Sequence, residues 1–174
     1  MPQLGDPNFH RAVVLVIEHS PAGAMGLVLN RASPLTLREL ADGQAFDIAP
    51  VHEAGSVFIG GPVEPQRGFV LHDSRDVDER HQILPGLFLS VTVDALAPIL
   101  HDPEAQLRFC MGYSGWGPKQ LEREINQGTW LFTEGASLHA LGGDPGRLWE
   151  STLRGMGVDP ATLLTAGRDR RGMN

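Results

Sequence analysis

The chain has few of the features from which extracellular and membrane-spanning proteins are built. It has one cysteine in 174 residues, Cys110, which excludes a disulfide within the chain. No apolar run approaches the roughly 20 residues that a transmembrane helix needs. The first residues lack the charged-then-apolar order of a secretion signal. We therefore expect a protein of the reducing cytoplasm, with no membrane partner.

Positive charge is also scarce. The chain has 14 Lys and Arg against 21 Asp and Glu, a formal net charge of −7. Binding to duplex DNA draws much of its free energy from basic side chains placed against phosphates. The only dense basic stretch, "RDRR" at residues 168–171, is expected to lie in a solvated, flexible tail over residues 168–174. Direct binding to duplex DNA is therefore not expected.

Glycine and proline, in contrast, are abundant, with 21 and 13 residues spread along the chain. This indicates many short elements joined by tight turns. Runs rich in Val, Ile, Leu and Phe predict strands, at residues 12–18, 25–30, 56–60, 68–72, 87–92, 107–112 and 129–132. The connection "HSPAGA" between the first two predicts a hairpin.

Short amphipathic runs predict helices, at residues 36–42, 94–102, 118–126 and 144–157. The residues that indicate where they begin are Thr36 with Glu39 at capping-box spacing, Asp94 and Asp144 as N-caps, and Pro118 and Pro145 at first helical positions. Because strands and helices do not alternate regularly, we expect one α+β domain over residues 1–174 rather than a doubly wound sheet.

One stretch partly matches a catalytic motif. Residues 112–116, "GYSGW", match most of the G-x-S-x-G nucleophile elbow between a strand and a helix. Trp116, however, stands where the motif needs a second glycine, and the only later histidine is His139. A glycine-rich corner with Tyr113 and Trp116 as half-buried anchors is therefore favoured over Ser114 as a nucleophile.

Other candidate sites are less specific. None of the seven histidines forms a metal-ligand motif, so no metal site is predicted. The turn "IGGPVEPQRG" lacks the signatures of phosphate-binding and dinucleotide-binding loops, so no cofactor is predicted. Its Gly60 and Gly61 are interpreted as serving unusual backbone dihedrals. Asn30-Arg31 and Arg67 interrupt apolar runs, and are interpreted as paired structural groups in preference to parts of an anion site.

Several long segments together resemble one family. They are "MPQLGDPNFHRAVVLVIEHSPAGAMGLVLNR", "FIGGPVEPQRGFVLH", "MGYSGWGPKQLEREINQGTWL" and "LWESTLRGMGVDPATL". On these segments most of the chain resembles the bacterial YqgE/AlgH family. The resemblance implies an α+β fold whose bifurcated, mostly antiparallel sheet is curled into a pseudo-barrel and flanked by short helices. It also implies a cytoplasmic protein of a kind often labelled a transcriptional regulator on genetic grounds.

The same resemblance assigns no functional residues to this chain. No catalytic residues are established for the family, and the position of Ser114 is often alanine there. Family members usually carry a short apolar strand ahead of "MPQ", so we expect that strand to be shortened or missing here, or the true start to lie upstream. An open sheet edge would then favour a homodimer. A cysteine common in the first strand is here Val16 or Ile17, so no redox role is carried over.

The favoured function is a non-enzymatic binding or regulatory protein whose partner is a small ligand or another protein. The alternative is a hydrolase-type enzyme that uses Ser114 or His72, and the third is a nucleic-acid-binding regulator. The candidate binding surface comprises Asn30, Arg31, Gly60, Gly61, Arg67, His72, Tyr113, Ser114 and Trp116.

Overall fold

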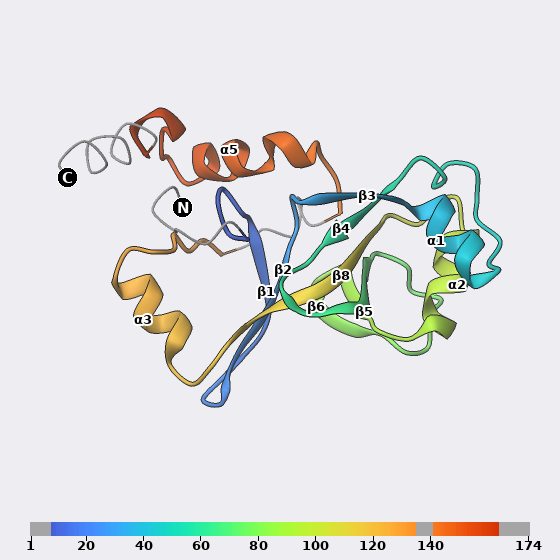
Figure 1. Cartoon of the computed structure of the whole chain (residues 1–174), viewed down its shortest axis with the longest axis horizontal. Coiled ribbons are helices and arrows are strands. Elements are labelled where there is room, and N and C mark those ends of the chain that lie inside the picture. Colours follow the sequence, from blue (N-terminus) through green and yellow to red (C-terminus); the bar gives the residue numbers. More distant parts are fainter. Residues whose placement is uncertain (1–7, 135–140, 164–174) are drawn as a thin grey trace.

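A computed structural model describes residues 8–134 and 141–163 of the chain (Figure 1). Its strands are β1 (Val14–Ser20), β2 (Gly23–Val28), β3 (Ala32–Thr36), β4 (Ser56–Ile59), β5 (Val63–His72), β6 (His81–Leu84), β7 (Leu87–Ser90) and β8 (Leu107–Trp116). The helices with assigned bounds are α1 (Leu37–Gln44), α2 (Val93–His101), α3 (Gln120–Asn126) and α5 (Pro145–Gly155). Within the described ranges, no helix is long and apolar enough to cross a bilayer.

The strands form one eight-stranded sheet that forks along β8. Its main path runs β1-β2-β8-β5-β7-β6, and β3 and β4 branch off it. One edge of β8 pairs first in parallel with β4, through Cys110 and Met111, and then antiparallel with β2, through Ser114 to Trp116. The other edge of β8 pairs antiparallel with β5. This confirms the α+β fold with a bifurcated, mostly antiparallel sheet, which is nearly closed into a barrel.

Glycines allow the chain to approach itself at the fork. The Val28 amide donates to the carbonyl of Gly60, and the Gly60 amide donates to the carbonyl of Met111, both at 2.8 Å. A Cβ on Gly60 would lie 2.3 Å from the carbonyl oxygen of Gly112, and one on Gly61 would lie 2.2 Å from the carbonyl carbon of Tyr113. No other residue fits these positions without moving the backbone.

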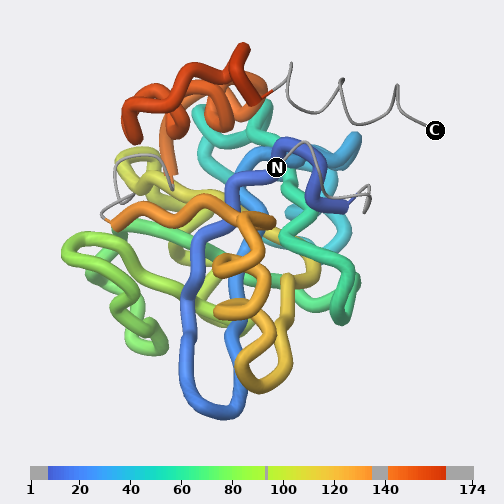
Figure 2. Tube along the Cα trace, turned by 90° about the vertical axis from the view of Figure 1, so that its left-hand side faces the viewer, coloured from blue at the N-terminus to red at the C-terminus, as the bar shows by residue number. Residues whose placement is uncertain are grey.

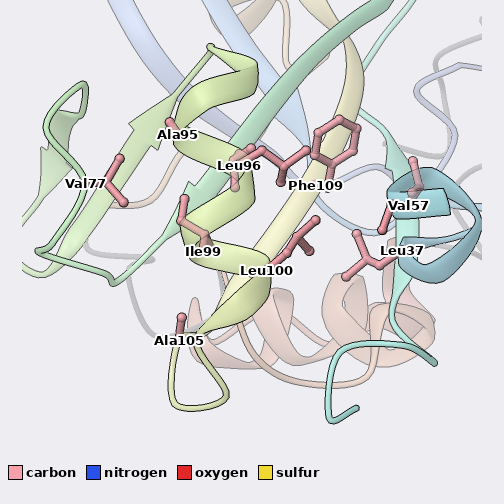
Figure 3. Close-up of a cluster of buried hydrophobic side chains, with 11 residues drawn as sticks. Leu37, Val57, Val77, Ala95, Leu96, Ile99, Leu100, Ala105 and Phe109 are labelled. Carbon is pink, nitrogen blue, oxygen red and sulfur yellow. The ribbon is translucent and has the colours of Figure 1, made fainter. Parts of the chain in front are cut away.

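Hydrophobic cores lie on both faces of the sheet, because successive side chains of a strand point to opposite sides. On β5, Phe69 and Leu71 belong to the core that includes Leu148 of α5, and Val70 belongs to the core beneath α1 and α2. Figure 3 shows this second core, with side chains of α2 on one side of Phe109 of β8 and those of α1 and β4 on the other. The α1–α2 layer and α5 therefore cover different faces.

Several local predictions are confirmed. "HSPAGA" turns β1 back onto β2 as an antiparallel hairpin, and α3 lies beside this hairpin in both views (Figures 1 and 2). The capping box is present, because Thr36 accepts the Glu39 amide at 3.2 Å and Glu39 accepts the Thr36 amide at 2.8 Å. Asp144 caps α5 by accepting the Gly146 amide at 2.8 Å.

Other boundary predictions were wrong. The N-cap of α2 is Thr92 rather than Asp94, and α3 begins at Gln120, two residues after Pro118. Residues 112–116 are not a corner, since they continue β8. Residues 129–132 form no strand, and β3 and β6 were not predicted. The expected tail at residues 168–174 and the expected change ahead of residue 1 lie outside the described residues.

Candidate functional site

The nine residues predicted to form one surface lie in different parts of the fold. Gly60, Gly61 and Ser114 are at the fork, Arg67 and Tyr113 are on β5 and β8, and His72 is buried at the end of β5. Trp116 faces α3, and Asn30 with Arg31 lies between β2 and β3 near the start of α5. The structure therefore brings only some of them together.

Ser114 is part of the architecture of the fork. Its side chain is fully buried, with 0% exposed, and its hydroxyl donates a 3.2 Å hydrogen bond to the Gly60 carbonyl. A nucleophilic serine must instead present its hydroxyl to a general base and to a substrate. In this geometry a substrate reaches Ser114 only if the paired strands separate.

His72 is buried in a hydrogen-bonded chain. Its Nε2 lies 3.0 Å from the Ser90 hydroxyl, which in turn donates to the Glu79 carbonyl at 2.7 Å. Because that hydroxyl has only one proton, it must accept from His72, so Nε2 carries a proton. Burial favours the neutral imidazole over the charged form. Burial holds the pKa of His72 below its ordinary value. Buried at 0% exposure, His72 cannot meet a substrate in this conformation.

Arg67 and Tyr113 share one acidic partner. Arg67 forms an ion pair with Glu64 at 3.2 Å and lies over the ring of Phe69, with its guanidinium carbon 5.3 Å from the ring centre. The Tyr113 hydroxyl lies 3.5 Å from the other carboxylate oxygen of Glu64. This agrees with the interpretation of Arg67 as a paired structural residue.

Trp116 holds α3 and the segment ahead of β1 against the sheet. Its indole nitrogen donates to Glu124 at 3.0 Å, and the indole of Trp130 donates to the same carboxylate oxygen at 2.8 Å. The ring of Phe9 lies 6.3 Å from Trp116 and 5.5 Å from Trp130. Residues 129–132 form no strand, but Trp130 still packs against the sheet, in a cluster that includes Ala24 of β2 and Trp116 of β8.

Asn30 and Arg31 line a cleft of about 240 Å³ between the segment ahead of β1, the β2–β3 connection and the start of α5. Figure 1 shows the start of α5 beside this connection. We call it the Arg11 cleft. Its lining residues are His10, Arg11, Asn30, Arg31, Pro145, Gly146, Trp149 and Glu150.

The side chain of Asn30 fixes the backbone of this cleft. Its Oδ1 accepts the Val13 amide, and its Nδ2 donates to the Arg11 carbonyl, both at 2.9 Å. Just ahead of these contacts, Arg11 has a φ of 53°, a left-handed conformation that a residue with a Cβ rarely adopts. The Arg11 guanidinium carbon lies 5.4 Å from the centre of the Trp149 ring, a cation–π contact.

Acidic groups near the cleft already have partners on α5. Glu150 forms an ion pair with Arg154 at 3.2 Å, and Asp144 lies 3.8 Å from Arg147. Arg11, by contrast, forms no ion pair within the described part of the chain.

Arg31 adds a second guanidinium, and its Nη2 donates to the His10 carbonyl at 3.4 Å. Two guanidinium groups, those of Arg11 and Arg31, therefore line the Arg11 cleft in a chain whose net charge is −7.

A family model described as AlgH-like matches residues 1–161. The chain belongs to the AlgH-like family. A UPF0301 protein of Myxococcus xanthus is 62% identical over 174 residues, covering 100% of this chain and 94% of that protein. A UPF0301 protein of Ruegeria pomeroyi is 38% identical over 171 residues, covering 95% and 92%. These matches confirm the family that the sequence motifs indicate.

Solved structures agree with this membership. The solution structure of the AlgH protein from Pseudomonas aeruginosa matches with a TM-score of 0.72 and 34% identity, over 95% of this chain and 89% of that one. A crystal structure of a protein from Corynebacterium diphtheriae matches with a TM-score of 0.71 and 22% identity, over 88% and 81%. At that identity the second match supports the fold alone.

Two observations concern metal-ligating and thiol side chains. Among residues 8–134 and 141–163, no three His, Cys, Asp or Glu side chains are grouped to hold a metal ion. Cys110 is fully buried, and burial raises the pKa of its thiol to about 12 although the nearby Arg108 acts in the opposite direction. Such a thiol stays protonated and packed at neutral pH.

Sequence patterns marked two of the eight residues that line the Arg11 cleft. Asn30 and Arg31 were detectable because they interrupt an apolar run, whereas Arg11, Trp149 and Glu150 were missed. Trp149 lies within the helix predicted over residues 144–157, but that prediction does not reveal that the distant Arg11 lies over its ring. Arg11 precedes the first strand and matches no catalytic or ligand-binding motif. Its backbone conformation is therefore visible only in the folded chain.

Proposed function

We propose that the protein acts by binding rather than by catalysis, and that the Arg11 cleft receives an anionic group of a small ligand or of a partner protein. The proposal rests on the environment and backbone conformation of Arg11. Its guanidinium is stacked on a buried tryptophan, has no acidic partner in the described structure, and is presented by a left-handed backbone. Conformations of this kind cost about 1–3 kcal/mol and are concentrated at functional sites.

The chemistry of arginine suits this role. A guanidinium stacked on an aromatic face keeps the N–H groups at its edge free, and their fork matches the two oxygens of a carboxylate or phosphate. Arg31, whose Nη2 donates to the His10 carbonyl, lines the same cleft. The cleft, about 240 Å³, is smaller than the roughly 300–1,000 Å³ of typical small-molecule pockets. It therefore suits a single oxyanion group better than a whole nucleotide.

The hydrolase alternative has less support, because Ser114 and His72 are both fully buried and lie apart. Direct recognition of duplex DNA is disfavoured by the net charge of −7. We infer that any regulatory role, which we place in the cytoplasm, is exerted through a bound ligand or protein.

Native mass spectrometry tests the proposal, by comparing the native and denatured masses of the purified protein. Calorimetric titrations with inorganic phosphate and with citrate then measure oxyanion binding directly. We expect Arg11→Gln to lose the bound mass and weaken binding about tenfold or more, as one charge-assisted contact is worth about 1.5–3 kcal/mol. Arg75→Gln, which removes an exposed arginine elsewhere, is the matched control. Equal binding by both variants, or no binding of either anion at millimolar concentration, would contradict the proposal.

A further inference from the structure

A second, larger cleft lies where α1 and α2 end, in the part of the molecule that Figure 1 places away from α5. It has a volume of about 420 Å³, and we call it the α1–α2 groove. Its lining residues are Arg38, Asp42, Phe46, Asp47, Ile48, Ala49, Pro50, His101 and Pro103.

Backbone hydrogen bonds fix the walls of the groove. The C-cap residue of helix α1, Ala45, has a left-handed conformation. The next amide, that of Phe46, donates back to the Ala41 carbonyl at 2.9 Å. The Ala49 amide donates to the Leu100 carbonyl in the last turn of α2 at 2.8 Å. Residues 46–49, which follow α1, are thus hydrogen-bonded to both helices, so the groove is formed without a partner.

The floor of the groove is apolar. Phe46 and Ile48 are half-buried and pack against the core beneath α1 and α2, and Ala49 is buried. Beside the lining residue Pro50, the side chain of Val51 is 65% exposed. A preformed apolar hollow with an exposed aliphatic residue beside it is typical of a protein interaction site.

The rim of the groove is acidic. Arg38 is the only arginine among its lining residues, and it pairs with both Asp42 at 3.4 Å and Glu53 at 3.1 Å. Asp47 forms no ion pair among the residues that the structure describes. Asp42 and Asp47 line the groove and Glu53 lies beside it, so these three carboxylates and the single guanidinium of Arg38 sum to a net charge of −2.

We propose that the α1–α2 groove docks a basic segment of a partner protein, with an aliphatic side chain on the floor and a Lys or Arg against Asp47. Charge complementarity selects this occupant. Nucleic acids and anionic lipid surfaces are repelled by the rim, and a second copy of this chain has a net charge of −7. The proposal is independent of the Arg11 cleft, since it uses other residues and the opposite sign of charge.

The test is a titration of the ¹⁵N-labelled protein with a short peptide in which pairs of leucine alternate with pairs of lysine. The peptide is acetylated and amidated at its ends, and binding is read from the amide chemical shifts of the protein. We expect the largest shift changes at residues 46–51 and 101–104. A peptide with glutamate in place of lysine should cause none. Asp47→Lys should weaken binding about tenfold, because it replaces attraction by repulsion at the rim.

Glu18→Lys on β1 makes the same change of charge at an exposed site on the β1–β2 hairpin and is the matched control. Equal losses in both variants would mean non-specific attraction to an acidic protein, and would overturn the proposal. Absence of binding, or shift changes spread over the surface, would do the same. Self-association of the free protein through residues 46–51, read by sedimentation, would identify a second copy as the occupant and also overturn it.

Discussion

The hydroxyl of Ser114 donates a hydrogen bond of 3.2 Å to the carbonyl of Gly60, at the point where the sheet forks. The same carbonyl accepts the Val28 amide at 2.8 Å, so it keeps a donor when the hydroxyl is removed. We expect Ser114→Ala to lower the free energy of unfolding by about 0.5–1.5 kcal/mol, the usual net value of one hydrogen bond. Urea unfolding measures this. Loss of a measurable activity without loss of stability would instead restore Ser114 as a catalytic candidate.

Gly61→Ala should be far more damaging. The new Cβ would lie 2.2 Å from the backbone of Tyr113, so β4 and β8 would have to separate. We expect the free energy of unfolding to fall by much more than about 1 kcal/mol, the effect of a typical substitution, and little folded protein to be recovered. Gly43→Ala is the control, since a Cβ at that position in α1 meets nothing within 4 Å. It should stabilise the protein by about 0.5–1 kcal/mol. Similar thermal midpoints for the two variants would contradict the role assigned to the fork.

The features that sequence patterns predicted well are those determined by neighbouring residues. The capping box of Thr36 and Glu39 and the N-cap Asp144 depend on contacts within one turn of a helix. The fork could not be predicted in this way, because β4 meets β8 across about 50 residues of chain. Gly112 was interpreted as the start of a corner. Pairing on both edges of β8 instead continues the strand through Trp116, with Gly112 at a left-handed φ of 70° within it.

The candidate site was predicted incompletely for the same reason. Polarity within an apolar run marked Asn30, but its function in the fold is to hold the backbone that follows Arg11, through the Arg11 carbonyl and the Val13 amide. That contact joins residues 17 to 19 positions apart. Nothing in the local sequence of Arg11 indicates a φ of 53° or a tryptophan from α5 beneath it. Only the long-range packing creates the cleft.

Trp116 is expected to be among the residues on which stability depends most. Its side chain is 7% exposed, and its indole shares a carboxylate oxygen of Glu124 with Trp130. Trp116→Ala should cost about 3–5 kcal/mol, the usual range for removing a buried large aromatic side chain. Trp116→Phe keeps most of the ring, while Glu124 keeps its bond to Trp130, so its cost should be clearly smaller. An unchanged urea midpoint for Trp116→Ala would show that the ring is a surface contact instead.

His72 should make stability depend on pH in the acidic range. Its imidazole is fully buried and neutral, and burial, assisted by the charge of Arg80, lowers its pKa, while the Ser74 backbone and Asp73 oppose the shift without cancelling it. The unfolded chain takes up a proton at an ordinary pKa of about 6.5, whereas the native protein does not until lower pH. The unfolded state therefore binds more protons in this window, and stability must fall as the pH decreases below about 6.5.

The slope due to His72 can reach about 1.4 kcal/mol per pH unit between the unfolded and folded pKa values. His72→Gln removes the titration and keeps an amide donor for Ser90, whose hydroxyl lies 3.0 Å from Nε2 in the native protein. We expect the variant to be less stable at neutral pH, because the amide fills the buried site imperfectly, but to lose less stability on acidification. Urea unfolding at a series of pH values measures both curves. Other groups titrate in both proteins, so the difference between the curves isolates His72. Parallel curves through the acidic range would show that His72 is protonated without cost in the native fold, and would contradict its buried, neutral assignment.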